Sequence, residues 1–125
     1  MTSLRESAIR RALAGDCLVG REVRVLPEVG STNDYLKEAA RGGAPEGLAV
    51  LAERQTAGKG RLGRSFQSPA GLGLWMSVLL RPACPPERLP PVTALTATAC
   101  AGAIREVCGA EVGVKWPNDL VLDGR

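Results

Sequence analysis

Residues 53–69, with the sequence ERQTAGKGRLGRSFQSP, restrict the fold of this chain more than any other segment. The glycines of the segment are Gly58, Gly60 and Gly63, and its cations are Arg54, Lys59, Arg61 and Arg64. No acidic residue lies between Glu53 and Glu87, so nothing nearby in the sequence neutralises this charge. Glycine permits sharp bends and close backbone approach, whereas dense charge on such a backbone is unfavourable without an anion. We therefore expect a loop that binds a phosphate or a carboxylate.

The glycine spacing also matches the G-x-G-x-x-G fingerprint of dinucleotide-binding folds. That fingerprint requires a strand before it, which the apolar run 48–53 (LAVLAE) predicts, and a helix opening on it. A helix is not expected here, because Pro69, Gly71 and Gly73 follow and residues 74–80 (LWMSVLL) have the composition of a second strand. The flanking strands thus exclude the dinucleotide fold, and a solvated surface loop is the alternative for this segment taken alone.

Composition excludes several classes of function. The 125 residues suffice for one domain, and a net charge of +3 is too small to indicate a nucleic-acid partner. Phe66 is the single aromatic residue of the basic segment, whereas binders of single-stranded nucleic acid need several stacking platforms. The chain contains no histidine, and its four cysteines show no C-x-x-C spacing. Zinc sites and nucleophiles activated by histidine are therefore not expected.

The remaining cues indicate a soluble cytoplasmic protein without a membrane partner. Residues 1–15 have dispersed charges and no apolar run, unlike a signal peptide. No segment approaches the ~20 apolar residues of a membrane span. We expect free thiols, as in a reducing compartment, with Cys100 and Cys108 buried in an apolar stretch.

Periodicity and turn residues predict the other elements. Leu4–Ala14 has helical spacing, a strand surrounds Val23 and Val25, and Ser31 or Thr32 caps a helix that ends at Arg41. The apolar run Val92–Cys108 predicts a buried helix, followed by strands at Glu111–Trp116 and Leu120–Leu122 with a turn between them.

The last residues predict a hairpin. Asp123-Gly124 after an apolar strand is a strong signal for a two-residue turn. Such a turn requires a returning strand, yet the sequence ends at Arg125. We expect a fragment that ends partway through its domain, with a frayed C-terminal tail as the alternative.

Two further polar segments accompany the basic loop. The segment 30–33 (GSTN) puts hydroxyl and amide groups at a helix N-terminus, where free N–H groups also bind acceptors. The segment 115–119 (KWPND) puts a cation, an amide and a carboxylate around a turn. Each is commonplace alone, as a helix cap or a surface turn; their order and joint content are specific.

Together, GSTN, ERQTAGKGRLGRSFQSP, LWMSVLLRP and VKWPNDL resemble the catalytic domain of biotin–protein ligases over residues 22–125. The resemblance implies an α+β fold with a mixed or antiparallel sheet packed with helices, similar to class II aminoacyl-tRNA synthetases. Residues 1–21 would be a helical extension without a DNA-binding domain, and the C-terminal part of the catalytic domain and an SH3-like domain would be missing. Lipoate–protein ligases share the fold but lack this basic loop. They are the runner-up, and a non-catalytic anion- or nucleotide-binding module is the other alternative.

The resemblance implies two chemical steps with biotin, ATP and Mg²⁺. Biotin would be activated to biotinyl-5′-AMP and then transferred to a lysine of a biotin carboxyl carrier protein. A homodimer is possible in this family. The family's key lysine would lie just beyond Arg125, so the fragment alone is expected to be inactive or nearly so.

The resemblance also implies roles for individual residues. Biotin would contact Ser31, Thr32, Gln55, Gly58, Lys59, Gly60, Arg61 and Trp116, where core packing is the alternative for Trp116. ATP would contact Arg61, Arg64, Phe66, Lys115, Asn118 and Asp119, of which Asp119 would also bind Mg²⁺. The catalytic cations would be Arg61, Lys59 and Lys115. Lys59 stands where many members carry arginine, and Leu62 where many carry a basic residue.

Overall fold

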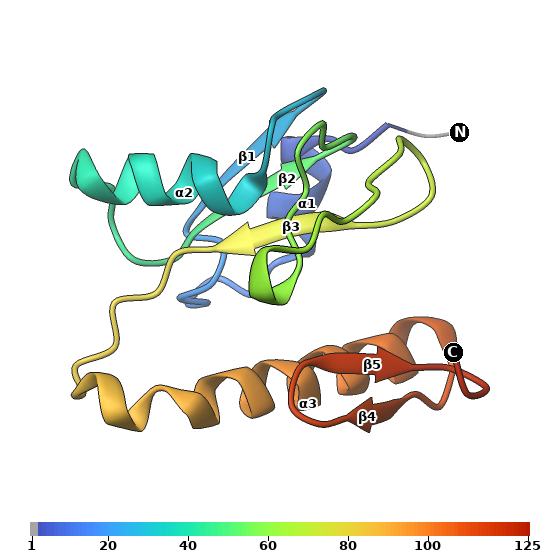
Figure 1. Cartoon of the computed structure of the whole chain (residues 1–125). Coiled ribbons are helices and arrows are strands. Elements are labelled where there is room, and N and C mark those ends of the chain that lie inside the picture. Colours follow the sequence, from blue (N-terminus) through green and yellow to red (C-terminus); the bar gives the residue numbers. More distant parts are fainter. Residues whose placement is uncertain (1–2) are drawn as a thin grey trace. The chain divides into compact units, whose positions relative to one another are not determined.

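The computed structural model describes residues 3–125, which form two compact units, one ending at Arg81 and the other spanning Pro82–Arg125 (Figure 1). Unit 1 contains, in chain order, α1 (Glu6–Ala12), β1 (Glu22–Leu26), α2 (Thr32–Arg41), β2 (Leu48–Ala52), the 3₁₀ helix η1 (Arg61–Gly63) and β3 (Trp75–Val78). Unit 2 contains the 3₁₀ helix η2 (Pro86–Arg88), α3 (Pro90–Cys108), β4 (Gly113–Lys115) and β5 (Asp119–Val121).

Unit 1 is built on a three-stranded sheet in the order β1-β2-β3. The first two strands are parallel and β3 is antiparallel to β2, so the sheet is mixed, as predicted. Parallel neighbours need a crossover connection, and α2 supplies it between β1 and β2. The predicted α+β fold is confirmed.

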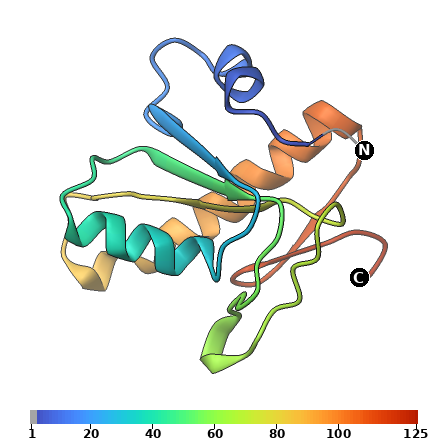
Figure 2. The same ribbon diagram turned by 90° about the horizontal axis from the view of Figure 1, so that it is seen from above.

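The core of unit 1 lies between α2 and the sheet (Figures 1 and 2). Leu36 of α2 packs with Leu48 and Val50, which are two residues apart and therefore share one face of β2. All five residues of β2 are buried, as expected for a central strand with an entirely apolar sequence.

Helix α1 covers the outer edge of β1. Glu6 accepts a hydrogen bond from the Val25 N–H through Oε1 (3.0 Å), and Arg10 Nη2 donates to the Val23 carbonyl (3.4 Å). These side chains satisfy backbone groups that an edge strand otherwise exposes. The predicted N-terminal helix is thus present, and its charged residues contact the sheet.

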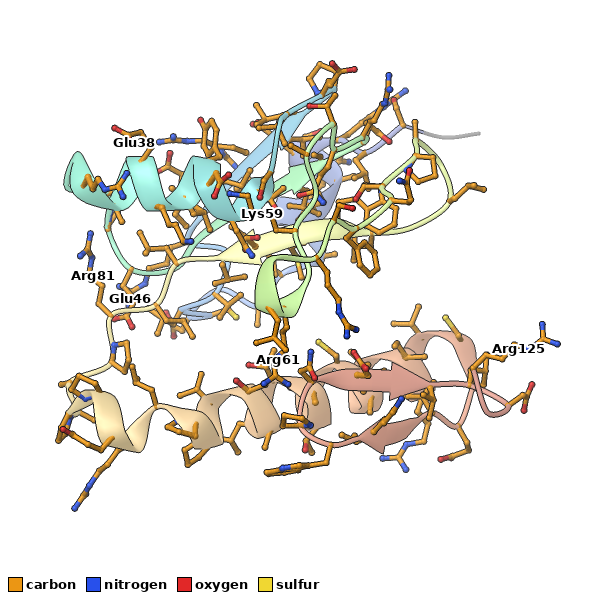
Figure 3. All side chains as sticks on the ribbon, viewed as in Figure 1. Glu38, Glu46, Lys59, Arg61, Arg81 and Arg125 are labelled. Atoms are coloured by element: carbon orange, nitrogen blue, oxygen red, sulfur yellow. The ribbon has the colours of Figure 1, made fainter. Side chains whose placement is uncertain are left out.

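Arg81 ends unit 1 by capping α2. Its Nη2 donates to the carbonyls of Ala40 (3.2 Å) and Ala44 (2.8 Å), while its backbone N–H donates to Glu46 Oε1 (2.8 Å). A cation is favourable at a helix C-terminus because the last carbonyls lack partners within the helix. Figure 3 shows Arg81 and Glu46 near this end of α2.

Unit 2 consists of one long helix and a short hairpin. Helix α3 ends at Gly109, whose left-handed backbone (φ 70°) lets its N–H bond to the Arg105 carbonyl. The prediction that this helix is buried is wrong, because Ala97 is its one buried residue. The elements of unit 2 that pack on it, β4 and β5, have three residues each and are too short to cover a helix of 19 residues.

The burial predicted for two thiols is wrong for the same reason. Cys108 is exposed and Cys100 is half-buried, although all four cysteines are free, as expected. Within residues 3–125, no helix is long and apolar enough to cross a membrane.

The predicted two-residue turn at Asp123-Gly124 is confirmed. Both residues have positive φ (51° and 79°), as a type I′ turn requires. Leu122 and Arg125 exchange backbone hydrogen bonds of 2.8 and 3.1 Å, so the chain reverses direction here.

Gly47 and Gly43 provide a matched pair for testing how closely the backbone before β2 approaches Leu18. Both have positive φ (95° and 90°), but a Cβ on Gly47 would lie 2.1 Å from the Leu18 carbonyl oxygen, whereas one on Gly43 meets nothing within 4 Å. Left-handed strain costs about 1–2 kcal/mol, so Gly43→Ala is expected to lower the unfolding free energy by about 1 kcal/mol. Gly47→Ala adds a backbone clash and is expected to cost about 3 kcal/mol. Urea denaturation measures both, and equal losses would contradict the packing described.

Candidate functional site

A partly buried polar cluster surrounds the N-terminal end of α2. Ser31 caps the helix by accepting a hydrogen bond from the Asp34 N–H (3.3 Å), and Ser31 and Thr32 are each only 3% exposed. The Thr32 N–H and hydroxyl donate to Gln55 Oε1 at 2.8 and 3.0 Å. Three of the predicted site residues, Ser31, Thr32 and Gln55, therefore lie together, because the N-terminal cap of α2 is adjacent to the segment that follows β2.

Two serines that were not predicted from the sequence complete the cluster. Gln55 Nε2 donates to Ser68 Oγ (2.9 Å), and Ser77 Oγ lies 2.7 Å from Thr32 Oγ1 and donates to Asn33 Oδ1. The Thr32 and Ser77 hydroxyls have one hydrogen each, so at any moment they can donate in only two of the three contacts Thr32–Gln55, Thr32–Ser77 and Ser77–Asn33. A hydroxyl within the otherwise apolar run LWMSVLL is the sequence signal that identifies Ser77.

The glycine loop, defined here as residues 58–66, forms a hairpin with its own backbone pairing. Lys59 and Ser65 face each other in an antiparallel bridge, closed by Gly60 N–H to Arg64 O (2.6 Å) and Phe66 N–H to Gly58 O (2.7 Å). Figure 2 shows the segment extending away from the sheet. At its tip Leu62 is 89% exposed and has left-handed backbone angles (φ 59°, ψ 37°).

Gly58 joins the loop to the polar cluster. A Cβ at this position would lie 2.5 Å from the Phe66 carbonyl oxygen, 2.6 Å from Ser68 Oγ and 3.1 Å from Gln55 Nε2. The first two contacts are shorter than those that Cβ atoms make in proteins, so a side chain at this position would force the Phe66 backbone and Ser68 to shift. At Gly60 the nearest atom, Arg64 Cβ, would be 3.4 Å away.

One cation of the glycine loop pairs with α2. Lys59 Nζ lies 2.7 Å from Asp34 Oδ2, and Figure 3 shows Lys59 beside the start of the helix. The hydrogen bond from Lys59 lowers the pKa of Asp34, and the charges of Lys59 and Lys37 act in the same direction. Asp34 was not among the predicted site residues, although an acid in the first turn after GSTN was visible in the sequence. Arg61 and Arg64 are exposed on the loop.

An aromatic pair lies where the loop returns to the sheet. Phe66 and Trp75 meet edge to face with ring centroids 6.0 Å apart, and Trp75 Nε1 donates to the Pro69 carbonyl (3.2 Å). Phe66 is exposed, so one of its faces is accessible to a ligand.

The predicted residues of unit 2 cluster around the β4–β5 turn. Lys115 and Asp119 are partners across the hairpin, while Trp116 and Asn118 lie in the turn. Trp116 is 75% exposed, so it is not a core residue. Within residues 3–125 no three His, Cys, Asp or Glu side chains are grouped to hold a metal ion. The predicted site residues thus form two groups, one in each unit.

Comparisons with known proteins agree on one family. The model of the Biotin/lipoate A/B protein ligase family matches residues 25–125. The bifunctional ligase/repressor BirA of Bacillus subtilis (strain 168) is 39% identical over 122 residues, which are 98% of this chain and 37% of BirA.

Solved structures give the same result. Biotin protein ligase from Aquifex aeolicus in complex with biotin and ATP matches with a TM-score of 0.72 and 36% identity over 82% of this chain and 42% of that one. The Leishmania major enzyme in complex with biotinyl-5-AMP matches with a TM-score of 0.70 and 33% identity over 84% and 49%. The chain therefore spans between 37% and 49% of the length of these relatives.

Gly58→Ala is expected to disrupt the base of the glycine loop, whereas Gly60→Ala is expected to be tolerated. The added methyl group at position 58 must displace Phe66 or the Gln55–Ser68 pair, since all three lie within 3.1 Å. NMR should show large shifts of the Gln55 side-chain amide and Phe66 backbone amide in Gly58→Ala alone. Unchanged signals in that variant would contradict the loop geometry.

Asp34 is expected to remain ionised at unusually low pH. Its pKa is lower in the folded protein than in the unfolded chain, so the ion pair with Lys59 contributes stability fully above the ordinary aspartate pKa of about 4. That contribution is lost as the pH falls through the lowered pKa. An NMR titration of the Asp34 carboxyl carbon should show its pKa rising towards the ordinary value in Lys59→Met, with a smaller rise in Lys37→Met. Identical titrations in wild type and Lys59→Met would refute the assigned cause.

Proposed function

The chain belongs to the biotin/lipoate A/B protein ligase family, and on that basis we propose that it forms part of the catalytic domain of a biotin–protein ligase. In the proposed reaction, a biotin carboxylate oxygen attacks the α-phosphorus of ATP, giving biotinyl-5′-AMP and releasing pyrophosphate. The amine of a carrier-protein lysine then attacks the acyl carbon, forming an amide and releasing AMP. The acceptor would be a biotin carboxyl carrier protein in the cytoplasm. Relatives named for biotin, with biotin, ATP and biotinyl-5-AMP in their structures, support this choice.

The polar cluster of Thr32, Gln55 and Ser77, in which Thr32 is buried and the other two are half-buried, is the observation that carries the proposal. The ureido ring of biotin has one acceptor and two donors and no charge, so its recognition needs neutral groups of both kinds. The cluster offers hydroxyls that both donate and accept, an amide oxygen and an amide N–H₂.

The glycine loop supplies the positive charge that the first step requires. Carboxylate and triphosphate repel each other, and negative charge develops further on the α-phosphate as the bond to the leaving pyrophosphate breaks. Arg61, exposed near the loop tip, is the residue we assign to the carboxylate and phosphate, since its planar guanidinium binds two oxygens at once. A loop closed over the mixed anhydride would also exclude water, which hydrolyses it.

The nucleotide contacts are assigned to the remaining predicted residues. The exposed face of Phe66 suits adenine, and Lys115 suits a phosphate. Asp119 and Asn118 provide a carboxylate and an amide oxygen, which fits Mg²⁺ held by one carboxylate together with substrate phosphates. When bound, this ion neutralises phosphate charge.

Biotin-dependent exchange of pyrophosphate into ATP tests the proposal, using the full-length protein that contains this chain. Biotin should support exchange and lipoate should not. Arg61→Ala is expected to reduce the rate by about 10²–10³-fold, the usual loss when one stabilising group at a developing charge is removed. Arg54→Ala is the matched control, because Arg54 pairs with Glu28 (3.3 Å) before the loop begins.

Two results would contradict this assignment. Exchange driven by lipoate instead of biotin would point to the other branch of the family. Equal rates in wild type and Arg61→Ala would remove Arg61 from the reaction.

A further inference from the structure

The glycine loop is attached to the start of α2 at two points. The Ala57 N–H donates to the Gly30 carbonyl at 2.7 Å, which fixes the base of the loop beside the helix cap. Two residues further on, the Lys59 ammonium contacts the Asp34 carboxylate, also at 2.7 Å. The glycine loop is therefore held beside the start of α2 by a backbone hydrogen bond at its base and by an ion pair.

Asp34 is positioned independently of the loop. It lies in the first turn of α2, and its N–H bonds to the Ser31 side chain. The positive end of the helix dipole stabilises a carboxylate in this turn. Leu36, two residues later, anchors the same helix in the core. The backbone of Asp34 is thus fixed by α2, and its carboxylate is the group that Lys59 contacts.

The ion pair involves one of the cations of the glycine loop. The Lys59 ammonium contacts the Asp34 carboxylate, and Arg61 and Arg64 lie further along the exposed loop. Arginine also suits oxyanions better, because its guanidinium forms two parallel hydrogen bonds and lysine does not. The residues that face the ligand need not include Lys59.

We propose that Asp34 is a positioning residue that holds the glycine loop against α2 through Lys59, so that Lys59 orders the loop and does not bind the substrate carboxylate. The identity of that substrate rests on the proposed function; the attachment of the loop does not. The ion pair is partly exposed, with 56% of the Lys59 and 44% of the Asp34 side chain accessible. Partly exposed ion pairs stabilise a structure only weakly, so the expected effects are about two- to fivefold.

Hydrogen exchange without ligand tests the attachment. The Gly60 and Phe66 amides bond within the loop, so their exchange reports its opening. Asp34→Asn and Lys59→Gln should each accelerate it about two- to fivefold, and the double variant should add nothing, because either change breaks the same ion pair.

Glu38→Gln is the matched control: it removes a carboxylate from α2 that pairs with Arg41 (2.9 Å) and should leave the loop amides unchanged. Lys59→Gln leaves the helix intact, so it remains informative even if Asp34→Asn weakens α2. Unaltered exchange in Lys59→Gln, or additive effects in the double variant, would overturn the proposal.

Biotin affinity, measured by calorimetry, then separates positioning from direct contact. If Lys59 acts by ordering the loop, Asp34→Asn and Lys59→Gln weaken binding by the same two- to fivefold factor. If Lys59 binds the carboxylate, Asp34 competes for it; Asp34→Asn then tightens binding while Lys59→Gln weakens it, and the proposal is refuted. Absence of biotin binding to the wild-type chain would count against the proposed function, while hydrogen exchange would still decide the role of Asp34.

Discussion

The burial of β2 is the constraint on which unit 1 depends. This strand pairs with β1 on one side and β3 on the other, and Leu48 and Val50 form the core with α2. The central position of the strand also constrains the residues at its two ends. Gly47 precedes it in a close approach to Leu18 that excludes any side chain, and Gln55 lies beyond its other end in the polar cluster. A central apolar strand thus sets where the candidate site begins.

The site itself combines rigid and adjustable parts. Thr32 and Gln55 are fixed by a helix cap and by the chain leaving β2, so their polar atoms are presented in a defined geometry. The glycine loop depends instead on backbone pairing at Gly58 and on one partly exposed ion pair.

Local patterns were sufficient to predict most elements and much of the site. A cap at Ser31 or Thr32 was predicted, and Ser31 is the residue that caps α2. The two-residue turn at Asp123-Gly124 and the strands before and after the basic segment were also predicted, because each depends on nearby residues. Contacts between distant residues were not predictable in this way. Ser68 and Ser77 join Gln55 and Thr32 only after the chain folds, and the ion pair of Asp34 needs the loop to return to α2. The apolar run of α3 indicated burial but not a partner able to provide it, and that prediction failed.

Helix α1 blocks one edge of the sheet, the edge formed by β1. Glu6 and Arg10 occupy the backbone groups of Val25 and Val23 that an additional strand would need at β1. A strand arriving at that edge would first have to displace a helix and break charge-assisted hydrogen bonds. The helix therefore disfavours the addition of a further strand at β1, including a strand from a second copy of the chain.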